Sequence, residues 1–313
     1  MNPKFSIVAP IYNEIDALPE LYSRVSSVME EIGDAWELVM VDDGSSDGST
    51  QKIMELYEQD RRVRPVLFSR NFGHQIAVTA GLDYSRGEAV VIIDSDLQDP
   101  PEVIQEMIER WREGYEVVYA VRTEREGETW FKEFTASLFY RIIYRITDVA
   151  IPMDTGDFRL LDRKAVDVMG NMRERHRFLR GMSVWVGFKQ IGVEYKREAR
   201  FAGETKYPLR KMTRFATDAI TSFSYFPLQL ASYLGFFSAA LAILAIPIVM
   251  YLRLTGSQAF FGQATTLIAV LFIGGVQLIS LGILGEYIGR VYDEVKHRPL
   301  YVVAFSPPED PEA

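Results

Sequence analysis

The first part of the chain alternates short apolar runs with longer segments whose apolar residues recur at helical spacing. The apolar runs are FSIVAP (5–10), WELVMVDD (36–43), VRPVLFS (63–69) and AVVIIDSD (89–96). Continuous apolar runs of this length indicate buried strands, and the segments 18–32, from Ser49 and from Gly73 predict helices between them. This order is typical of βαβ units, so we expect an α/β fold with a mainly parallel sheet covered by helices.

The fourth predicted strand ends abruptly in carboxylates, with Asp94 and Asp96 directly after the apolar run and Asp99 close behind. The carboxyl ends of strands are where open α/β sheets bind ligands. Two acids separated by one residue repel each other unless a cation lies between them, and a divalent metal carried by a nucleotide diphosphate meets that need. The alternative is a polar turn before the helix predicted near Pro100, which Asp99 alone would cap.

The first two predicted strands end in an aromatic ring and several acceptors. Tyr12 and Glu14 follow the first strand, and Asp42 and Asp43 end the second. This combination suits a nucleoside, whose base stacks and whose ribose hydroxyls need acceptors. The segment DDGSSDGST also reads as a Gly/Ser turn with Ser49 capping a helix, a structural role that need not exclude nucleoside binding. No GxGxxG follows the first strand, which disfavours the dehydrogenase form of this architecture.

Three acids and one histidine at predicted helix starts and turns have simpler readings. We expect Asp16, Asp47 and Asp99 to be helix caps rather than ligands. We expect His74 to cap or pack near the turn at 71–73.

Composition narrows the function classes further. With 313 residues and 48% hydrophobic content, the chain can bury a full core and carry something extra. The net charge of -9 argues against nucleic acid as the main partner. There is no cysteine, and the three histidines are too scattered to suggest a zinc site.

Apolar character is concentrated near the end of the chain. Two uncharged segments, 228–251 and 264–284, are each long enough to cross the ~30 Å hydrocarbon core of a bilayer as a helix. Cations flank the outer ends of this predicted hairpin: Arg210, Lys211 and Arg214 before it, and Arg290, Lys296 and Arg298 after it. We therefore expect an integral membrane protein with both termini cytoplasmic. The alternative is a pair of buried helices in a soluble core.

The remaining segments complete the predicted organisation. Residues 1–208 form the α/β domain, 209–226 an amphipathic juxtamembrane helix, 227–289 the hairpin and 290–313 a cytoplasmic tail with a disordered, acidic end. A further segment, 130–146, is also amphipathic, and it lies in the headgroup region or against the core. Small residues in the second span favour helix association, so we expect a homo-oligomer.

Five motifs within residues 5–211 carry a family pattern: VAPIYNE, VDDGSSDGS, the segment 69–102, DTGDFRLLDRKAV and RFAGETKYPLRK. With them the chain resembles family 2 glycosyltransferases of the GT-A fold. Within that family it resembles the polyprenyl-phosphate branch, which includes dolichol-phosphate mannose synthase and the bactoprenol (undecaprenyl-phosphate) glucosyltransferases. The predicted hairpin extends this resemblance.

The resemblance implies roles for the residues that match the donor side of the family's site. The nucleoside would be held by Pro10, Tyr12, Glu14 and Asp42 or Asp43. Asp94 and Asp96 would form the DXD motif that takes Mg²⁺ or Mn²⁺ together with the donor diphosphate, which makes Asp94 a catalytic residue. Arg200 and Lys206 would approach the donor phosphates.

The acceptor side involves a second phosphate. The resemblance implies that the lipid phosphate would meet Arg122, Lys132 and Arg200, and that Asp157 is the catalytic acidic residue near the sugar. A phosphate monoester has its second pKa at about 6 and is mostly a dianion at neutral pH, so it needs little help from a base. We therefore interpret Asp157 as a group that orients the sugar or the acceptor-binding cations.

The implied reaction transfers a sugar, with glucose from UDP-glucose as the first candidate, to undecaprenyl phosphate at the cytoplasmic membrane face. Direct attack on C1 predicts inversion, and the product would serve later glycan or O-antigen modification. One alternative is a processive polysaccharide synthase, although the QxxRW signature is missing and two spans make a poor channel. A non-catalytic membrane scaffold is the other.

Overall fold

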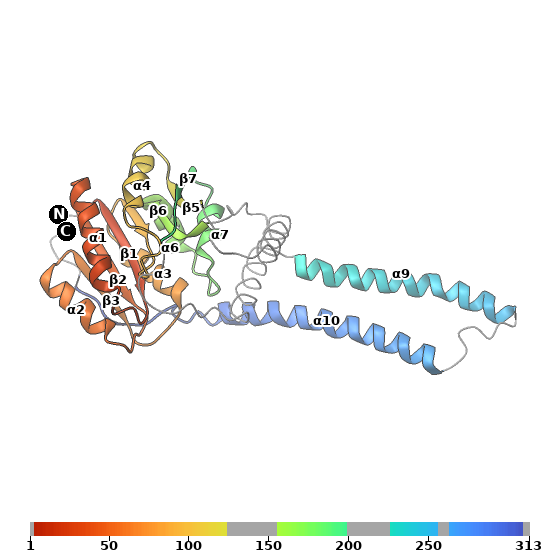
Figure 1. Cartoon of the computed structure of the whole chain (residues 1–313). Helices are drawn as coiled ribbons and strands as arrows, with labels where there is room; N and C mark the ends of the chain where they lie inside the picture. The colour runs from red at the N-terminus through yellow and green to blue at the C-terminus, as the bar shows by residue number, and fades with distance from the viewer. Residues whose placement is uncertain (1–2, 124–154, 199–225, 256–262, 309–313) are drawn as a thin grey trace. The chain divides into compact units, whose positions relative to one another are not determined.

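The computed structural model describes residues 3–123, 155–198, 226–255 and 263–308 (Figure 1). The chain divides into two units. One consists of Met1–Ala219 with Arg298–Ala313, and the other of Ile220–His297. The first unit holds a mixed sheet covered by helices, and the second holds two long helices.

Eight strands form one sheet in the order β7-β5-β6-β4-β1-β2-β3-β8. Parallel pairing joins β1 to β2 and β4, β2 to β3, and β5 to β7, whereas β6 and β8 run antiparallel to their neighbours. The predicted α/β class with a mainly parallel sheet is therefore confirmed. The strands are β1 (Phe5–Ile11), β2 (Trp36–Asp42), β3 (Val63–Phe68), β4 (Ala89–Ile92), β5 (Val117–Arg122), β6 (Thr155–Asp162), β7 (Gln190–Tyr195) and β8 (Val303–Phe305).

Helices cover both faces of the sheet. Their bounds in this unit are α1 (Leu18–Ile32), α2 (Ser49–Gln59), α3 (His74–Tyr84), α4 (Val103–Arg112), α6 (Arg163–Asn171) and α7 (Leu179–Trp185). The apolar faces of α1, α2 and α4 share one core cluster with alternate residues of β1, such as Phe5 and Ile7. On the opposite face α3 lies against Val8 of β1, and a Cβ at Gly81 would come within 2.1 Å of that side chain. Glycine therefore permits this close helix–strand contact.

The antiparallel strand β6 determines which residues lie beside the carboxyl ends of the parallel strands β1, β2 and β4. Its register with β4 pairs Ile92 with Arg159 and Ala89 with Asp162. Continuing that register past the end of β4 places Asp157 beside Asp94. The first residues of β6 thus join the carboxyl ends of β4, β1 and β2 at one edge.

The segment after the second long helix returns to the sheet. Strand β8 pairs with the outer strand β3, and the Ser69 amide donates to the Val302 carbonyl at 3.0 Å. Tyr301 stacks on Phe68 with ring centroids 5.2 Å apart, and its hydroxyl donates to Asp83 at 2.7 Å. The sequence pattern of this predicted tail did not indicate a strand.

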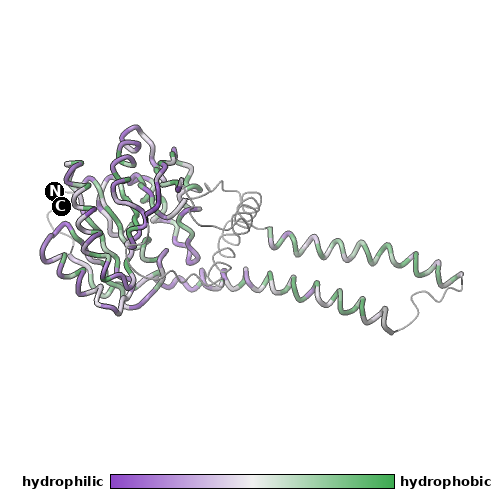
Figure 2. The backbone as a smooth tube through the Cα atoms, viewed as in Figure 1, coloured by the Kyte–Doolittle hydropathy of each residue, from purple (hydrophilic) through white to green (hydrophobic). Residues whose placement is uncertain are grey.

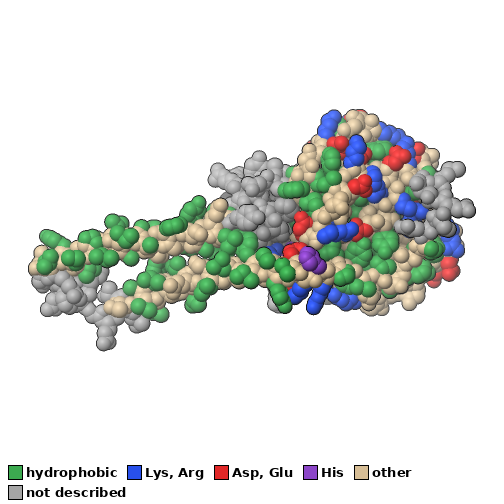
Figure 3. Space-filling view, turned by 180° about the vertical axis from the view of Figure 1, so that it is seen from behind, with side chains coloured by type: hydrophobic (Ala, Val, Ile, Leu, Met, Phe, Trp, Pro, Cys, Tyr) green, Lys and Arg blue, Asp and Glu red, His purple; other side chains and the backbone are tan. Residues whose placement is uncertain are grey.

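The second unit contains α9 (Phe226–Leu254) and α10 (Gln263–Val295), which pack against each other. Two stretches, Phe226–Leu252 and Ile268–Val295, are long and apolar enough to cross a membrane. Hydrophobic residues run along both helices (Figure 2), and their side chains, such as Phe236 and Leu271, are mostly exposed (Figure 3). The predicted pair of apolar helices is confirmed.

A buried polar network lies near the first residues of β1 and β2, at the opposite end of these strands from Asp42. Glu37, only 2% exposed, accepts hydrogen bonds from Ser6 Oγ at 2.6 Å and from the Arg86 amide at 2.7 Å. Arg86 Nε donates to the same carboxylate at 3.0 Å, and buried Arg64 lies 3.4 Å from it. Glu37 therefore ties the loop between α3 and β4 to the sheet.

We expect Glu37→Ala to destabilise this unit by about 3 kcal/mol, because it leaves buried Arg64 without its carboxylate. The partly exposed pair of Lys4 and Asp34 provides the control, and Lys4→Ala should cost less than about 1 kcal/mol. Chemical unfolding of the full-length protein in detergent measures both. Equal effects of the two substitutions would contradict this account of the network.

Candidate functional site

The loop after β1 is fastened to the loop after β2. Asn13, with a φ of 56°, accepts from the Ser46 amide at 2.8 Å, and its own amide donates to Ser45 Oγ at 3.0 Å. Asp47 receives the amides of Ile15 at 3.1 Å and Ser49 at 2.9 Å. Asp47 therefore binds the first amide of α2 from one position before the N-cap, which is Gly48 and not the expected Asp47.

The residues predicted to hold a nucleoside lie on and beside these loops. Tyr12 is 50% exposed, Glu14 is partly exposed, and Pro10 is buried within β1 opposite Val41. Asp42 accepts from the Ser45 amide at 3.0 Å and from the Thr50 hydroxyl. The structure brings these residues to one edge, and their contact with a nucleoside stays a prediction.

Asp43 holds the loop before α3. It is 2% exposed and accepts the amides of Phe72 at 2.6 Å and Gly73 at 2.9 Å. Burial raises the pKa of its carboxyl, and these two hydrogen bonds oppose that rise. Gly44, with a φ of 71°, lets the same loops meet, since a Cβ there would lie 2.6 Å from the Arg70 carbonyl carbon. Asp43 therefore has a structural function that the sequence did not indicate.

Asp94 and Asp96, the acidic pair after β4, include one carboxylate oxygen that is available to a cation. Asp94 Oδ1 is buried and accepts no hydrogen bond, with His74 Nε2 3.6 Å away. Burial raises the pKa of the Asp94 carboxyl to about 6, and the neighbouring carboxylates add to this effect while His74 opposes it. Asp96 accepts the Gln98 amide at 3.1 Å.

Across the described residues, no three His, Asp or Glu side chains are grouped so as to hold a metal ion. The pair therefore fits a metal only as a partial site, completed by oxygens from a ligand.

Asp157 lies beside this pair and is almost fully buried, with 6% exposure. Its Oδ1 accepts from Arg180 Nε at 2.8 Å, and its Oδ2 accepts from Gln75 Nε2 at 2.9 Å and lies 3.3 Å from His74 Nε2. Burial alone would raise the pKa of this carboxyl, but Arg180 and His74 outweigh it and hold the pKa well below its usual range. Asp157 is thus a fixed carboxylate and a weak base.

His74 occupies a different place from the one expected. It is the first residue of α3, and its ring lies between Asp94 and Asp157 instead of packing on the turn at 71–73. The His74 side chain is 45% exposed, and partial desolvation would lower its pKa, but the hydrogen bond to Asp157 and the charge of Asp94 raise the pKa to about 9. At neutral pH a protonated imidazole therefore separates the two carboxylates.

Asp99 is also not the helix cap that we expected. It is fully buried, and it accepts from the Tyr195 hydroxyl while Arg122 lies 3.8 Å and Arg197 3.9 Å from the same oxygen. The first turn of α4 receives no side-chain cap. Arg122 Nε donates to the Tyr195 hydroxyl at 3.1 Å, so the cation predicted to meet the lipid phosphate is held by Tyr195 and lies beside a buried acid.

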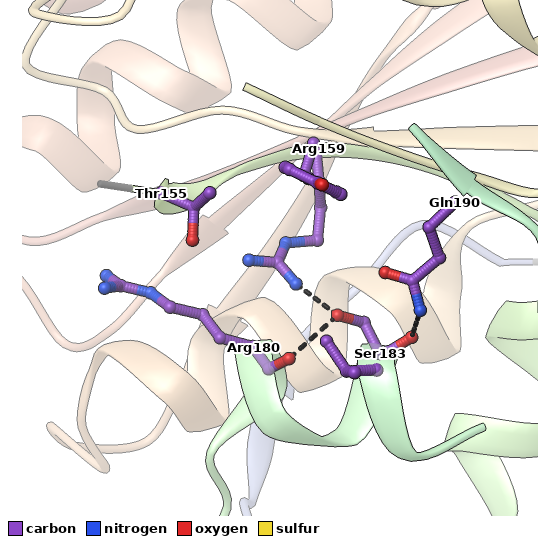
Figure 4. Close-up of a pocket in the computed structure, with 7 residues that line it drawn as sticks. Thr155, Arg159, Arg180, Ser183 and Gln190 are labelled. Atoms are coloured by element: carbon purple, nitrogen blue, oxygen red, sulfur yellow. Dashed lines mark hydrogen bonds between the residues drawn. The ribbon is translucent and has the colours of Figure 1, made fainter. Parts of the chain in front are cut away.

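A small polar cavity of about 10 Å³ lies beside the start of α7 (Figure 4), about the space of one water molecule. Arg159, 3% exposed, donates to Ser183 Oγ and to the Gly156 carbonyl, the latter at 2.8 Å. Burial lowers the pKa of Arg159 to about 10, so it stays charged at neutral pH. Ser183 Oγ donates in turn to the Arg180 carbonyl at 3.0 Å within α7. The hydrogen bond from Arg159 to Ser183 Oγ therefore ties α7 to β6.

Sequence reasoning missed four contributors to this edge: Gln75, Arg159, Arg180 and Tyr195. Gln75, Arg180 and Tyr195 are separated from their partners by long stretches of chain, and Arg159 lies within a strand whose apolar pattern gave it no functional signal. Only the fold brings these residues together. Lys132, Arg200 and Lys206, with the amphipathic segments 130–146 and 209–225, lie outside the described residues.

Comparison of the sequence with known proteins assigns the chain to a family. The model of glycosyl transferase family 2 matches residues 6–170. An uncharacterized glycosyltransferase, YkcC, of Bacillus subtilis is 53% identical over 300 residues, which cover 96% of this chain and 93% of the relative. The bactoprenol glucosyl transferase of Shigella phage SfV is 41% identical over 96% of this chain and 98% of its own length.

Among solved structures, a mannosyltransferase of Pyrobaculum calidifontis in complex with GDP-Man and Mn²⁺ matches with a TM-score of 0.46. It is 16% identical, and the match covers 90% of this chain and 88% of that one. The family assignment depends on the sequence comparisons alone. By the match of its family model and the identity of its relatives over nearly their whole lengths, the chain belongs to glycosyl transferase family 2.

Proposed function

We propose that this protein transfers glucose from UDP-glucose to a polyprenyl phosphate, undecaprenyl phosphate in the first instance, at a membrane surface. The observation that carries the proposal is that Asp94 and Asp157 meet around His74 where the parallel strands β1, β2 and β4 end. The chain is also 41% identical to a protein named bactoprenol glucosyl transferase. Two long apolar helices suit an enzyme whose acceptor is a lipid.

The donor side of the proposal involves Asp94, Asp96 and a divalent cation, Mg²⁺ or Mn²⁺. Asp94 Oδ1, which is buried and accepts no hydrogen bond, supports this assignment. When bound, the cation would neutralise charge on the leaving diphosphate. Tyr12, exposed at the same edge, offers a surface for a nucleoside base.

The acceptor side requires cations, because a lipid phosphate dianion must approach a donor that is itself anionic. Arg122, held by Tyr195 and Asp99, is our candidate for the acceptor phosphate, with Lys132 and Arg200 as further candidates. A phosphate oxygen forms a bond to C1 of the sugar as the bond from C1 to the donor diphosphate breaks, which inverts C1. Asp157, held by Arg180 and Gln75, orients the reacting groups and takes no proton.

We further propose that α9 and α10 span the inner membrane as a hairpin, with the α/β unit in the cytoplasm. The chain leaves this unit before α9 and rejoins it at β8, which pairs with β3. Two crossings return a chain to the side from which it started, and cations flank the outer ends of the hairpin. A homo-oligomer formed through the hairpin remains part of the proposal.

The first prediction concerns the product. Membranes that contain the protein, supplied with undecaprenyl phosphate, a divalent cation and a panel of labelled nucleotide sugars, should move label from UDP-glucose into the lipid fraction as one sugar per lipid. Membranes without the protein are the control. A water-soluble polymer would instead favour the processive synthase, and absence of transfer from every donor would contradict a catalytic role.

The second prediction concerns the acidic pair. Asp94→Asn and Asp96→Asn should each lower the transfer rate on the order of 100-fold or more, because cation binding and charge neutralisation are lost. Chelation should abolish transfer by the wild type, and added Mg²⁺ or Mn²⁺ should restore it. Asp167→Asn, on an exposed face of α6, is the control and should leave the rate unchanged. Chelator-resistant transfer would contradict the metal assignment.

The third prediction separates orientation from base catalysis at Asp157. Asp157→Asn should lose activity at every pH, because the neutral amide has one acceptor oxygen and cannot keep the contacts with both Arg180 and His74. The measurement is the transfer rate of wild type and variant from neutral to alkaline pH. Recovery of the variant at high pH would identify Asp157 as a base and overturn this assignment.

A further inference from the structure

Three elements far apart in the sequence converge on the Asp157 carboxylate. Asp157 lies on β6, His74 and Gln75 lie in the first turn of α3, and Arg180 lies in the first turn of α7. The match to the family model ends at residue 170, so Arg180 lies beyond it. The carboxylate therefore owes its orientation to a helix outside the matched region.

Gln75 connects two of these elements. Its Nε2 donates to Asp157 at 2.9 Å while its Oε1 accepts the amide of Leu179 at 3.0 Å. Each end of the amide meets a partner of the opposite kind, because a carboxylate only accepts and a backbone N–H only donates. This pairing fixes the orientation of the amide and links the first residue of α7 to Asp157. Arg180, the next residue, is thereby placed at the carboxylate.

Arg180 supplies the charge that the buried carboxylate needs. A carboxylate with 6% exposure is costly unless it is paired and hydrogen-bonded. Arg180 Nε donates to Asp157 Oδ1 at 2.8 Å, so the two oxygens of Asp157 have separate donors. The other charged groups that face Asp157 are His74 from α3, Asp94 after β4 and Arg159 on β6 itself.

We propose that Arg180 and Gln75 are positioning residues for sugar transfer, which hold Asp157 as a fixed, negatively charged group through a clamp between α7 and α3. Arg180 supplies the charge and Gln75 the geometry. This proposal rests on the proposed glycosyl transfer, since it assigns roles within the same site. It adds that the start of α7, outside the family match, sets the activity of Asp157.

The test compares Arg180→Met with Arg180→Lys in full-length protein. Arg180→Met should lower kcat on the order of 100-fold with little change in the KM for the donor, because orientation is lost and donor contacts are kept. Arg180→Lys keeps the charge and should recover most of that loss. A fall in kcat that Arg180→Lys does not recover in any part would overturn the role of the charge.

Gln75→Met tests the geometric part of the clamp. It removes both the donor to Asp157 and the acceptor for the Leu179 amide, so it should lower kcat with little change in the KM for the donor. A kcat that stays at the wild-type value in Gln75→Met would overturn the clamp.

The matched control is Arg173→Met, which breaks a surface pair of Arg173 and Asp83 with an N–O distance of 2.7 Å. It should leave kcat within about twofold of the wild type, as expected for an exposed pair. A loss as large as that of Arg180→Met would show that any broken arginine–aspartate pair has this effect.

A double-mutant cycle separates this proposal from the proposed function. In the Asp157→Asn background, Arg180→Met should cause no further loss of kcat, and the effects on thermal unfolding should be strongly non-additive. If the wild type transfers no sugar, the proposed function fails, yet the unfolding cycle still reports on the clamp. Additive effects of the two substitutions on thermal unfolding would then overturn it.

Discussion

Antiparallel pairing of β6 with β4 sets two carboxylates side by side at the edge of the sheet, and the repulsion between Asp94 and Asp157 is the constraint to which the surrounding residues respond. His74 lies between them, with its Nε2 3.6 Å from Asp94 and 3.3 Å from Asp157. Arg180 binds the far side of Asp157. The site is therefore charge-balanced around Asp157, whereas Asp94 keeps an oxygen without a hydrogen bond. The two acids therefore differ: Asp157 is held by its partners, and Asp94 keeps an oxygen that accepts no hydrogen bond.

Much of the fold could be predicted because its signals are local. The buried strands β1 to β4 and helix α1 follow from apolar periodicity, with Pro19 in the first turn of α1 and Gly33 at its end. Strands β6 and β8 could not be derived in the same way, because their direction and neighbours depend on contacts far away in the sequence. Strand β8 is three residues long and follows a pair of apolar helices, so periodicity gives it no signal.

The residues of the candidate site also fall into those with a local sequence signal and those that depend on distant contacts. Asp94, Asp96 and Tyr12 could be predicted because strand ends in an α/β sheet have a defined place. The reading of Asp99 as a cap and of His74 as a packing residue was wrong, because both have partners far away in the sequence. Asp99 meets Tyr195 from β7, and His74 meets Asp157 from β6. The sequence around a charged residue next to a turn does not indicate which distant charge it will contact.

The loop that carries the acidic pair is itself held by the core. Leu97 has a φ of 57°, a left-handed conformation unusual for a leucine, yet its side chain is 1% exposed within the main core cluster. That conformation costs about 1 kcal/mol, and burying a leucine side chain contributes about 2 kcal/mol. Burial of Leu97 therefore keeps the chain in a turn that the backbone alone disfavours. Asp96 directly precedes Leu97, so the buried leucine also holds the backbone of the acidic pair in place. A preformed loop lowers the entropic cost of ordering these residues when a ligand binds.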